Sequence, residues 1–204
     1  MIRMLSICLL MLSINAKAQK GYQIGDIASD FSLKSTTEKN VSLSNYQNAK
    51  GYIVVFTCNT CPVSKAYQDR IEALNKEFSA KGYPVIAINT NDPITSPGDS
   101  FEKMQAVVNI KNISYAYLED PNHVYTKMYG ASKTPHTFVL QKTAKGNEVV
   151  YIGAIDNDQQ EENSDRDDYV KSAVNSLLKG EKPKVATTKA IGCSIKWKKD
   201  GTSD

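Results

Sequence analysis

Two cysteines separated by two residues are the part of this sequence whose types and spacing most directly indicate chemistry. Cys58 and Cys61 lie in the stretch VVFTCNTCPVS, between an apolar run and a proline. A C-x-x-C pair serves as a redox dithiol, as half of a zinc site, as a haem attachment site or as a structural disulfide. Haem attachment needs a histidine directly after the second cysteine, and because Pro62 stands there, this motif excludes it.

The redox use explains best why the pair stands where a strand gives way to a helix. A zinc site needs four ligands, and the further candidates Cys193, His123 and His136 come from distant segments. A bridge across two residues restricts little chain entropy. A cysteine at the start of a helix, in contrast, meets peptide dipoles and free N–H groups that stabilise a thiolate. We interpret Cys58, nearer the strand end and more exposed, as the nucleophile and Cys61 as the resolving thiol.

The residues on either side of the pair predict the elements that hold it. The run GYIVVF at 51–56 is continuously apolar and β-branched, as in a strand buried on both faces. From Pro62 onward apolar residues recur at helical spacing, and Gly82 suits the end of that helix. The run YPVIAIN at 83–89 reads as a second buried strand. Together these segments predict a parallel, right-handed βαβ unit.

The remainder of the chain predicts an α/β fold in which a central mixed sheet is flanked by helices on both faces. After the βαβ unit we expect a helical insertion, then a β-hairpin, then a last helix. The helices are expected at 101–110, 122–130 and 168–180, and the hairpin strands at 133–141 and 145–155. The last stretch has no clear periodicity and reads as a tail.

The N-terminal residues read as a secretory signal peptide. Arg3 precedes an apolar stretch at 4–14, and Ala16-Lys17-Ala18 forms an A-x-A cleavage signal, so we expect cleavage before Gln19. An uncleaved membrane anchor is the alternative. The expected organisation is a signal peptide at 1–18, one domain at 19–180 and a C-terminal tail at 181–204.

Composition limits the classes of partner. The 204 residues are 41% hydrophobic and 23% charged, which suits one globular domain. Loss of the expected signal peptide lowers the formal charge from +3 to +1, because Arg3 and Lys17 leave with it. This leaves no bulk electrostatic case for binding nucleic acid or a membrane surface. Of the 4 cysteines, Cys8 leaves as well, so an odd number remains.

The sequence resembles the thioredoxin-like superfamily, and within it the redoxin branch of alkyl hydroperoxide reductase/thiol-specific antioxidant type. The matching pieces are IGDIASDFSL, VVFTCNTCP, VIAINTND, KTPHTFVL and VVYIGAIDN, which extend over roughly residues 22 to 180. The C-N-x-C-P site and the ending KAIGCSIKW are similar to one subgroup of bacterial thioredoxin-family proteins. The resemblance implies a thioredoxin-like fold with a redoxin-type N-terminal extension.

The resemblance also implies a third part of the site. In the family a cis proline faces the dithiol, and its match here is Pro135, preceded by Thr134. The backbone of Thr134 is then expected to pair with an extended substrate segment. The sequence departs from thioredoxin itself, which has Trp before the first cysteine and Gly-Pro between the two. Here Thr57 and Asn59-Thr60 occupy those positions, and the buried acid of thioredoxin has no counterpart, so a general base for Cys61 is unassigned.

These features predict an exported, periplasmic or secreted thiol–disulfide oxidoreductase. Cys58 thiolate would attack a disulfide of a protein substrate and Cys61 would release the product. No bound cofactor is required, since a partner dithiol supplies or accepts the electrons. Cys193 is a candidate third redox thiol that reaches back to Cys58, a docking cysteine for a partner, or a tail cysteine without catalytic duty.

Two alternative functions come from the same residues. A thiol-dependent peroxidase of the peroxiredoxin type has Pro and Thr or Ser at seven and three residues before its cysteine. Neither Cys58 nor Cys61 has such residues at those positions, which favours disulfide exchange. A metal-binding module for copper or zinc is the second alternative, with His136 close to the dithiol. Copper-delivery relatives have a spacing one residue longer, and we interpret His136 as a half-exposed residue at a strand start.

Overall fold

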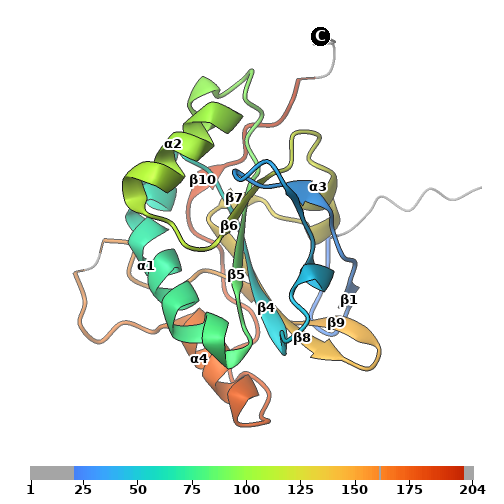
Figure 1. Ribbon diagram of the computed structural model, residues 1–204. Coiled ribbons are helices and arrows are strands. Elements are labelled where there is room, and N and C mark those ends of the chain that lie inside the picture. Colours follow the sequence, from blue (N-terminus) through green and yellow to red (C-terminus); the bar gives the residue numbers. More distant parts are fainter. Residues whose placement is uncertain (1–20, 161, 200–204) are drawn as a thin grey trace, which may run out of the picture.

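A mixed sheet forms the centre of the protein (Figure 1). The computed structural model describes residues 21–160 and 162–199, so the expected signal peptide lies outside the described residues. The sheet has 6 strands in the order β1-β9-β8-β4-β5-β6. Its strands are β1 (Ile27–Ala28), β4 (Gly51–Thr57), β5 (Val85–Asn89), β6 (Ala116–Glu119), β8 (His136–Thr143) and β9 (Gly146–Gly153). Neighbours from β4 to β6 run parallel, and the remaining neighbours run antiparallel.

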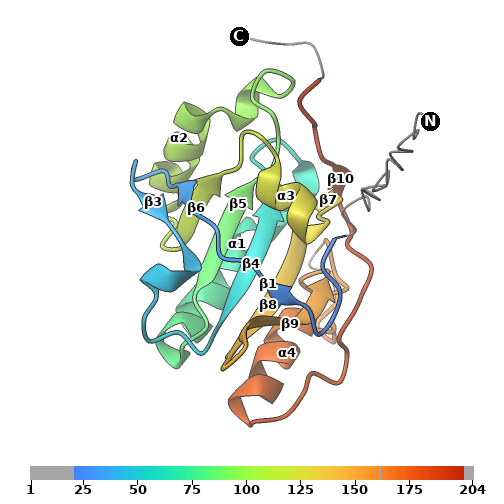
Figure 2. The ribbon, with the colours of Figure 1, turned by 90° about the vertical axis from the view of Figure 1, so that its right-hand side faces the viewer.

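Helices and short segments cover both faces of this sheet. The helices are α1 (Pro62–Phe78), α2 (Phe101–Lys111), α3 (Val124–Tyr129) and α4 (Tyr169–Leu178), with 3-10 turns η1 (Leu43–Asn45), η2 (Ser79–Lys81) and η3 (Pro97–Asp99). Figures 1 and 2 show α1, α2 and α4 on one face and α3 with the N-terminal segment on the other. Two small ribbons complete the fold: β2 (Leu33–Lys34) with β3 (Asn40–Val41), and β7 (Lys133–Thr134) with β10 (Cys193–Ser194).

The central strand β4 explains how the two faces are held together. All its residues are buried, and alternate side chains enter opposite clusters. Ile53 and Val55 pack with the α1, α2 and α4 side, while Val54 and Phe56 pack with the α3 side. A strand that is buried on both faces must be apolar throughout, which is the reason for the continuous run in the sequence. Its carboxyl end is consequently fixed in position.

The structure confirms the predicted fold class and most of the predicted elements. The βαβ unit, the hairpin β8–β9 and the helices over 101–110, 122–130 and 168–180 are all present within a few residues of their expected bounds. The predicted helical insertion lacked one element, because β6 lies between α2 and α3 and pairs in parallel with β5. The 4 residues of β6 are too few to show a period, and tertiary pairing with β5 decides their conformation.

The C-terminal stretch that reads as a tail makes short contacts with the domain. The described part of the tail lies against the domain, with Thr187 bridged to Ile152 of β9 and β10 paired with β7. Each of these contacts involves only one or two residues, so they leave no periodicity in the sequence. Within the described ranges 21–160 and 162–199, no helix combines the length and the apolar character that crossing a bilayer requires.

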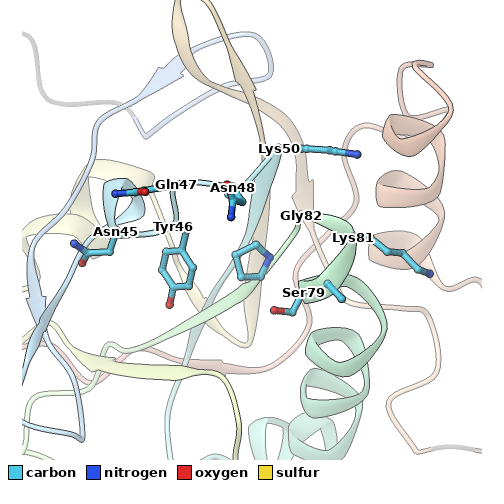
Figure 3. Close-up of a pocket in the computed structure, with 11 residues that line it drawn as sticks. Asn45, Tyr46, Gln47, Asn48, Lys50, Ser79, Lys81 and Gly82 are labelled. Carbon is cyan, nitrogen blue, oxygen red and sulfur yellow. The ribbon is translucent and has the colours of Figure 1, made fainter.

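A cavity of about 530 Å³ lies at the amino end of β4 and β5, at the opposite end of these strands from the cysteines. Its lining comes from residues 45–50 and 79–82 together with Pro84. Figure 3 shows the two segments facing each other. Its lining contains carboxamide, hydroxyl and lysine side chains but no cysteine, histidine or acid. We therefore do not assign chemistry to it.

A buried ion pair joins α1 to the segment after β9. Arg70 donates from Nη1 to Oδ2 of Asp156 at 2.6 Å, and both side chains are almost fully buried. Tyr67 donates its hydroxyl proton to Oδ1 of the same carboxylate at 2.7 Å, and burial followed by this contact raises the pKa of Tyr67. Arg70 also donates to the carbonyl oxygen of Gln159. The carboxylate of Asp156 therefore fixes two side chains of α1 at once.

We expect the substitution Asp156→Asn to lower the free energy of unfolding by about 3 kcal/mol or more, because it leaves the charge of Arg70 buried beside a neutral group. Urea unfolding followed by circular dichroism measures the change. Glu77→Gln is the control, since Glu77 is partly exposed and pairs with Lys81 and Lys171 at the surface, where a pair contributes less than about 1 kcal/mol. Equal losses in the two variants would contradict the assignment.

Candidate active site

The two cysteines of the C-x-x-C pair occupy the loop between β4 and α1. β4 ends at Thr57, and α1 begins at Pro62 with Cys61 as its N-cap. The carbonyl oxygen of Cys61 accepts the N–H of Lys65 at 3.0 Å, which is the first hydrogen bond of the helix. The buried strand and the helix thus hold the loop from both ends, as the sequence predicts. Cys58 and Cys61 are 5% and 3% exposed, so both side chains are buried and Cys58 is the more exposed of the two by a small margin.

Thr134 lies against both sulfur atoms. Its hydroxyl oxygen is 3.3 Å from Sγ of Cys58, and its carbonyl oxygen is 3.3 Å from Sγ of Cys61. The hydroxyl of Ser64 in α1 lies 3.8 Å from Sγ of Cys58. The peptide bond between Thr134 and Pro135 is cis, which confirms the conformation that the family resemblance implies. The structure therefore brings the predicted residues Cys58, Cys61, Thr134 and Pro135 into one place.

Cys193 forms a disulfide with Cys61, across a sequence separation of 132 residues. Their Cα atoms are 6.0 Å apart, within the usual range for a disulfide. Among the described residues, Cys58 is the free cysteine. One of the three roles that the sequence left open for Cys193 was a redox thiol that reaches back to Cys58, whereas the structure pairs it with Cys61. Cys58 and Cys61 are consequently one thiol and one half of a disulfide, side by side at Thr134.

The segment that carries Cys193 lies alongside Thr134 as a short antiparallel strand. Cys193 pairs with Thr134 and Ser194 with Lys133 in the register of β10 and β7. Figure 2 shows these two strands next to each other beside α3. The following residue, Ile195, is 4% exposed and belongs to the hydrophobic cluster on that face of the sheet. An extended peptide carrying a disulfide-bonded cysteine thus occupies the edge next to the cis proline.

A buried carboxylate, Asp99, holds the residues between the cysteines. It accepts the N–H of Asn59 at 2.5 Å and the hydroxyl of Thr60 at 2.7 Å. Further donors to it are Asn91 and Ser96, at 2.9 and 2.7 Å. Several hydrogen bonds to one carboxylate offset the cost of burying its charge. The loop conformation that presents Cys58 and Cys61 therefore depends on Asp99.

Sequence reasoning missed Asp99 and its neighbour Tyr117. The hydroxyl of Tyr117 donates to Oδ1 of Asn59 at 2.9 Å, and burial, with the nearby Asp99, raises the pKa of Tyr117 well above its usual value. The sequence signal that could have indicated this network is the group of Asn and Asp residues that begins directly after the strand over 83–89 and includes Asn91, which donates to Asp99. The carboxyl ends of adjacent parallel strands share one edge of a sheet, which brings such residues to the loop after the neighbouring strand.

A cavity of about 330 Å³ reaches Cys58 from the side of α1 and α2. Cys58 and Ser64 lie at one part of its lining. The rest of the lining is largely apolar and aromatic, with Ile71, Val107, Ile110, Tyr115 and Tyr117, and it includes Lys65 and Lys111. Neither Thr134 nor Cys193 lines this cavity. Cys58 is therefore approached from a different side than the one that β10 covers.

The two histidines are buried and have structural contacts. His136 is 8% exposed, so its interpretation as a half-exposed residue is wrong, and burial lowers its pKa to about 4. Its Nδ1 accepts the N–H of Ser132 at 3.4 Å. His123 accepts the N–H of Lys198 through Nε2 and stacks edge-on with Trp197. In the part of the chain that the structure describes, no group of three or more His, Cys, Asp or Glu residues is arranged to hold a metal ion.

Residues 24–148 match the AhpC/TSA family, which is more than half of the chain. The chain belongs to the AhpC/TSA family. This AhpC/TSA protein is similar to the thioredoxin-like protein YneN of Bacillus subtilis, with 27% identity over 154 residues, 74% of this chain and 85% of YneN. It is also similar to the thiol-disulfide oxidoreductase ResA of Oceanobacillus iheyensis, with 26% identity over 146 residues, 70% of this chain and 71% of ResA.

Solved structures share this fold. An uncharacterized conserved protein from Geobacillus kaustophilus superposes with a TM-score of 0.79 and 28% identity, over 88% of this chain and 94% of that one. The mixed sheet with helices on both faces is the thioredoxin-like fold expected for the redoxin branch. The AhpC/TSA protein therefore has the fold that its sequence predicted.

We expect Asp99→Asn to loosen the loop between the cysteines. The side-chain amide of the introduced Asn would present N–H groups where the N–H and hydroxyl donors around Asp99 need an acceptor. The free energy of unfolding should therefore fall by about 2 kcal/mol. The alkylation rate of Cys58 by iodoacetamide should rise as the loop opens, which peptide mass spectrometry measures. Asp165→Asn, at an exposed acid, is the control and should change neither quantity. An unchanged alkylation rate in Asp99→Asn would contradict the positioning role.

His136 gives the protein a defined pH dependence of stability. Its pKa is about 4 in the folded chain and about 6.5 when unfolded, so below pH 6.5 the unfolded chain binds a proton that the folded chain does not. Stability should therefore fall by about 3 kcal/mol between pH 7 and pH 4 through this residue. Comparing urea unfolding of the natural protein and His136→Gln over this range isolates the effect. The two curves should converge as the pH falls, and parallel curves would contradict the assignment.

Proposed function

We propose that the protein is an extracytoplasmic thiol–disulfide oxidoreductase that exchanges disulfides with protein substrates through Cys58 and Cys61. Membership of the AhpC/TSA family and similarity to a protein named thiol-disulfide oxidoreductase support an oxidoreductase that acts on thiols. The observation that carries the proposal is local. A free thiol on Cys58 and a disulfide on Cys61 meet at one residue, Thr134.

The exchange uses both thiols of the reduced pair in turn. The Cys58 thiolate attacks one sulfur of a substrate disulfide, and the other substrate sulfur leaves as a thiolate. Cys61 then attacks the sulfur of Cys58 and releases the second substrate thiol, which leaves a Cys58–Cys61 disulfide. Two electrons pass from the protein to the substrate, and a partner dithiol restores the reduced pair. The same steps in reverse oxidise a substrate dithiol.

Thr134 and Pro135 form the proposed substrate-binding part of the site. A strand that adds to an exposed backbone edge gains affinity from main-chain hydrogen bonds regardless of most side chains. The pairing of Cys193 with Thr134 supports this role, because a cysteine-bearing segment already lies there in extended form. The site thereby suits a substrate whose cysteine lies in an extended or locally unfolded segment.

An exported location fits the same chemistry. Disulfides form and persist in oxidising compartments, and the Cys61–Cys193 bond is a disulfide of this chain. The sequence of residues 1–18 supplies the proposed export signal, ahead of a domain at 19–180 and a tail at 181–204. The C-N-x-C-P site and the ending KAIGCSIKW support, in this proposal, membership of one subgroup of bacterial thioredoxin-family proteins.

Substitution of Cys58 and substitution of Cys61 should have different effects on the reaction with a substrate disulfide. Cys58→Ser should lower the rate of insulin disulfide reduction at least about 100-fold, because the attacking thiolate is lost. Cys61→Ser, combined with Cys193→Ser, should accumulate a mixed disulfide between Cys58 and the substrate, which non-reducing electrophoresis and peptide mapping detect. Cys193→Ser alone retains the dithiol and is the matched control for removal of one cysteine.

Two experimental results would contradict the proposed function. The assigned roles would be reversed if Cys58→Ser formed a mixed disulfide through Cys61 while the variant with Cys61→Ser and Cys193→Ser formed none through Cys58. Rapid catalytic consumption of hydrogen peroxide with a thiol reductant, without turnover of insulin, would establish the peroxidase alternative in place of disulfide exchange.

A further inference from the structure

The C-terminal residues 192–198, here called the docked segment, occupy the edge that the proposed function gives to a substrate. β10 lies within this segment and pairs with β7 in register, with Cys193 opposite Thr134. Lys133 donates from Nζ to the hydroxyl of Ser194 at 3.1 Å. The docked segment thus has the placement expected of a bound peptide whose cysteine has been captured by Cys61.

Contacts beyond the disulfide hold the docked segment in this place. The N–H of Asp92 donates to the carbonyl oxygen of Lys196 at 2.8 Å, and the N–H of Lys196 donates to Oδ1 of Asn91 at 2.9 Å. The N–H of Lys198 donates to His123 at 2.9 Å. The side chain of Ile195 is buried in the core cluster of that face. Each of these hydrogen bonds has a modest net worth, so the docked segment is suited to reversible docking.

A close approach at Gly192 shows how tightly the edge fits an extended chain. A Cβ atom at this position would lie 2.1 Å from the carbonyl oxygen of Thr134, which no real contact allows. The residue before the captured cysteine must therefore be glycine if the strand is to keep this register. The edge accordingly fits an extended Gly-Cys sequence.

A separate anchor upstream allows the docked segment to move without disturbing the rest of the fold. The N–H of Thr188 donates to the carbonyl oxygen of Ile152, and the N–H of Ile152 donates to that of Ala186, both at 3.0 Å. The hydroxyl of Thr188 accepts the N–H of Ala154 at 2.9 Å. This anchor fixes residues 186–188 to β9, and residues 189–191 connect it to the docked segment.

We propose that the docked segment is a tethered occupant of the substrate edge, which Cys58 displaces by taking over the disulfide of Cys61. This inference rests on the proposed function and adds a device that governs access to it. The Cys58 thiolate attacks Sγ of Cys61, the Cys61–Cys193 bond breaks as a Cys58–Cys61 bond forms, and Cys193 leaves as a thiolate that takes up a proton. The exchange leaves the number of disulfides unchanged, so it needs no external oxidant or reductant.

The isomer with a Cys61–Cys193 bond and the isomer with a Cys58–Cys61 bond differ in which part of the site a partner can reach. With Cys61 bonded to Cys193, the edge at Thr134 is filled and Cys58 is reached through the cavity between α1 and α2. With Cys58 bonded to Cys61, the docked segment is no longer held by a disulfide. It then competes with a partner for the edge at Thr134 only because residues 189–191 keep it close to that edge. The partner that replaces it is an extended polypeptide with a glycine before its reactive cysteine.

Trp197 is the chain's only tryptophan and lies in the docked segment, so its fluorescence reports release directly. All proteins in the test are full-length and carry Cys8→Ser, which leaves Cys58, Cys61 and Cys193 as the only thiols. In Cys58→Ser, reduction of the Cys61–Cys193 bond should raise acrylamide quenching of Trp197 about twofold, because the docked side chain is 40% exposed. Its anisotropy should fall as well. Unchanged quenching and anisotropy would overturn the proposal.

Exchange kinetics test whether the docked segment restricts access. The oxidised proteins are mixed with a reduced ten-residue peptide that carries Gly-Cys and a second cysteine, and its oxidation is followed by mass spectrometry. Cys193→Ser and Gly192→Ala should react about tenfold faster than the natural protein, because a tethered occupant lowers the fraction of open sites. Ile191→Ala is the control, since Ile191 is exposed and precedes the docked segment, and it should match the natural rate.

The outcomes separate this inference from the function on which it rests. Equal rates for the natural protein, Cys193→Ser and Gly192→Ala, all of them active, would overturn the tethered occupant and leave the oxidoreductase standing. No reaction in any protein would refute the oxidoreductase, and the Trp197 measurement would then decide by itself whether the segment is released. Faster exchange in both variants, with the Trp197 change, supports the proposal.

Discussion

The contact of Thr134 with two sulfur atoms is the interaction on which the rest of this site depends. Thr134 in β7 presents its hydroxyl to Cys58 and its carbonyl to Cys61. Its own backbone is simultaneously paired with the strand of Cys193. Because Thr134 is fully buried and is followed by the cis proline, its position relative to the thiols is set by the fold. Both the proposed exchange and the proposed displacement need this fixed geometry.

The thiols are held equally firmly from the opposite direction. β4 is buried on both faces and delivers Cys58 at its carboxyl end, while α1 begins immediately after Cys61. Asp99 then secures the residues between them through hydrogen bonds that also satisfy its own buried charge. In the proposed mechanism this loop keeps its position while the disulfide partners exchange. The mobile part of the proposed mechanism is therefore the C-terminal segment.

Much of the fold could be predicted because its signals are local. The apolar run of β4, the helical periodicity after Pro62 and the hairpin that follows Pro135 each occupy one continuous stretch, and each was found. β6 was missed because it is short and owes its conformation to pairing with β5. The burial of His136 was missed for a related reason, since exposure at a strand start depends on what packs over it. In both cases the deciding neighbour is distant in sequence.

The family resemblance supplied the proline expected opposite the thiols, whereas the sequence by itself determined the thiol pair and its place between a strand and a helix. These follow from residue types and spacings, which act through short-range sterics and hydrogen bonding. The tertiary structure alone decided that Cys193, 132 residues away, bonds to Cys61, and that Asp99 supports the loop. A disulfide requires two Cα atoms within about 7 Å, and only the folded path of the chain brings residues so far apart to that distance.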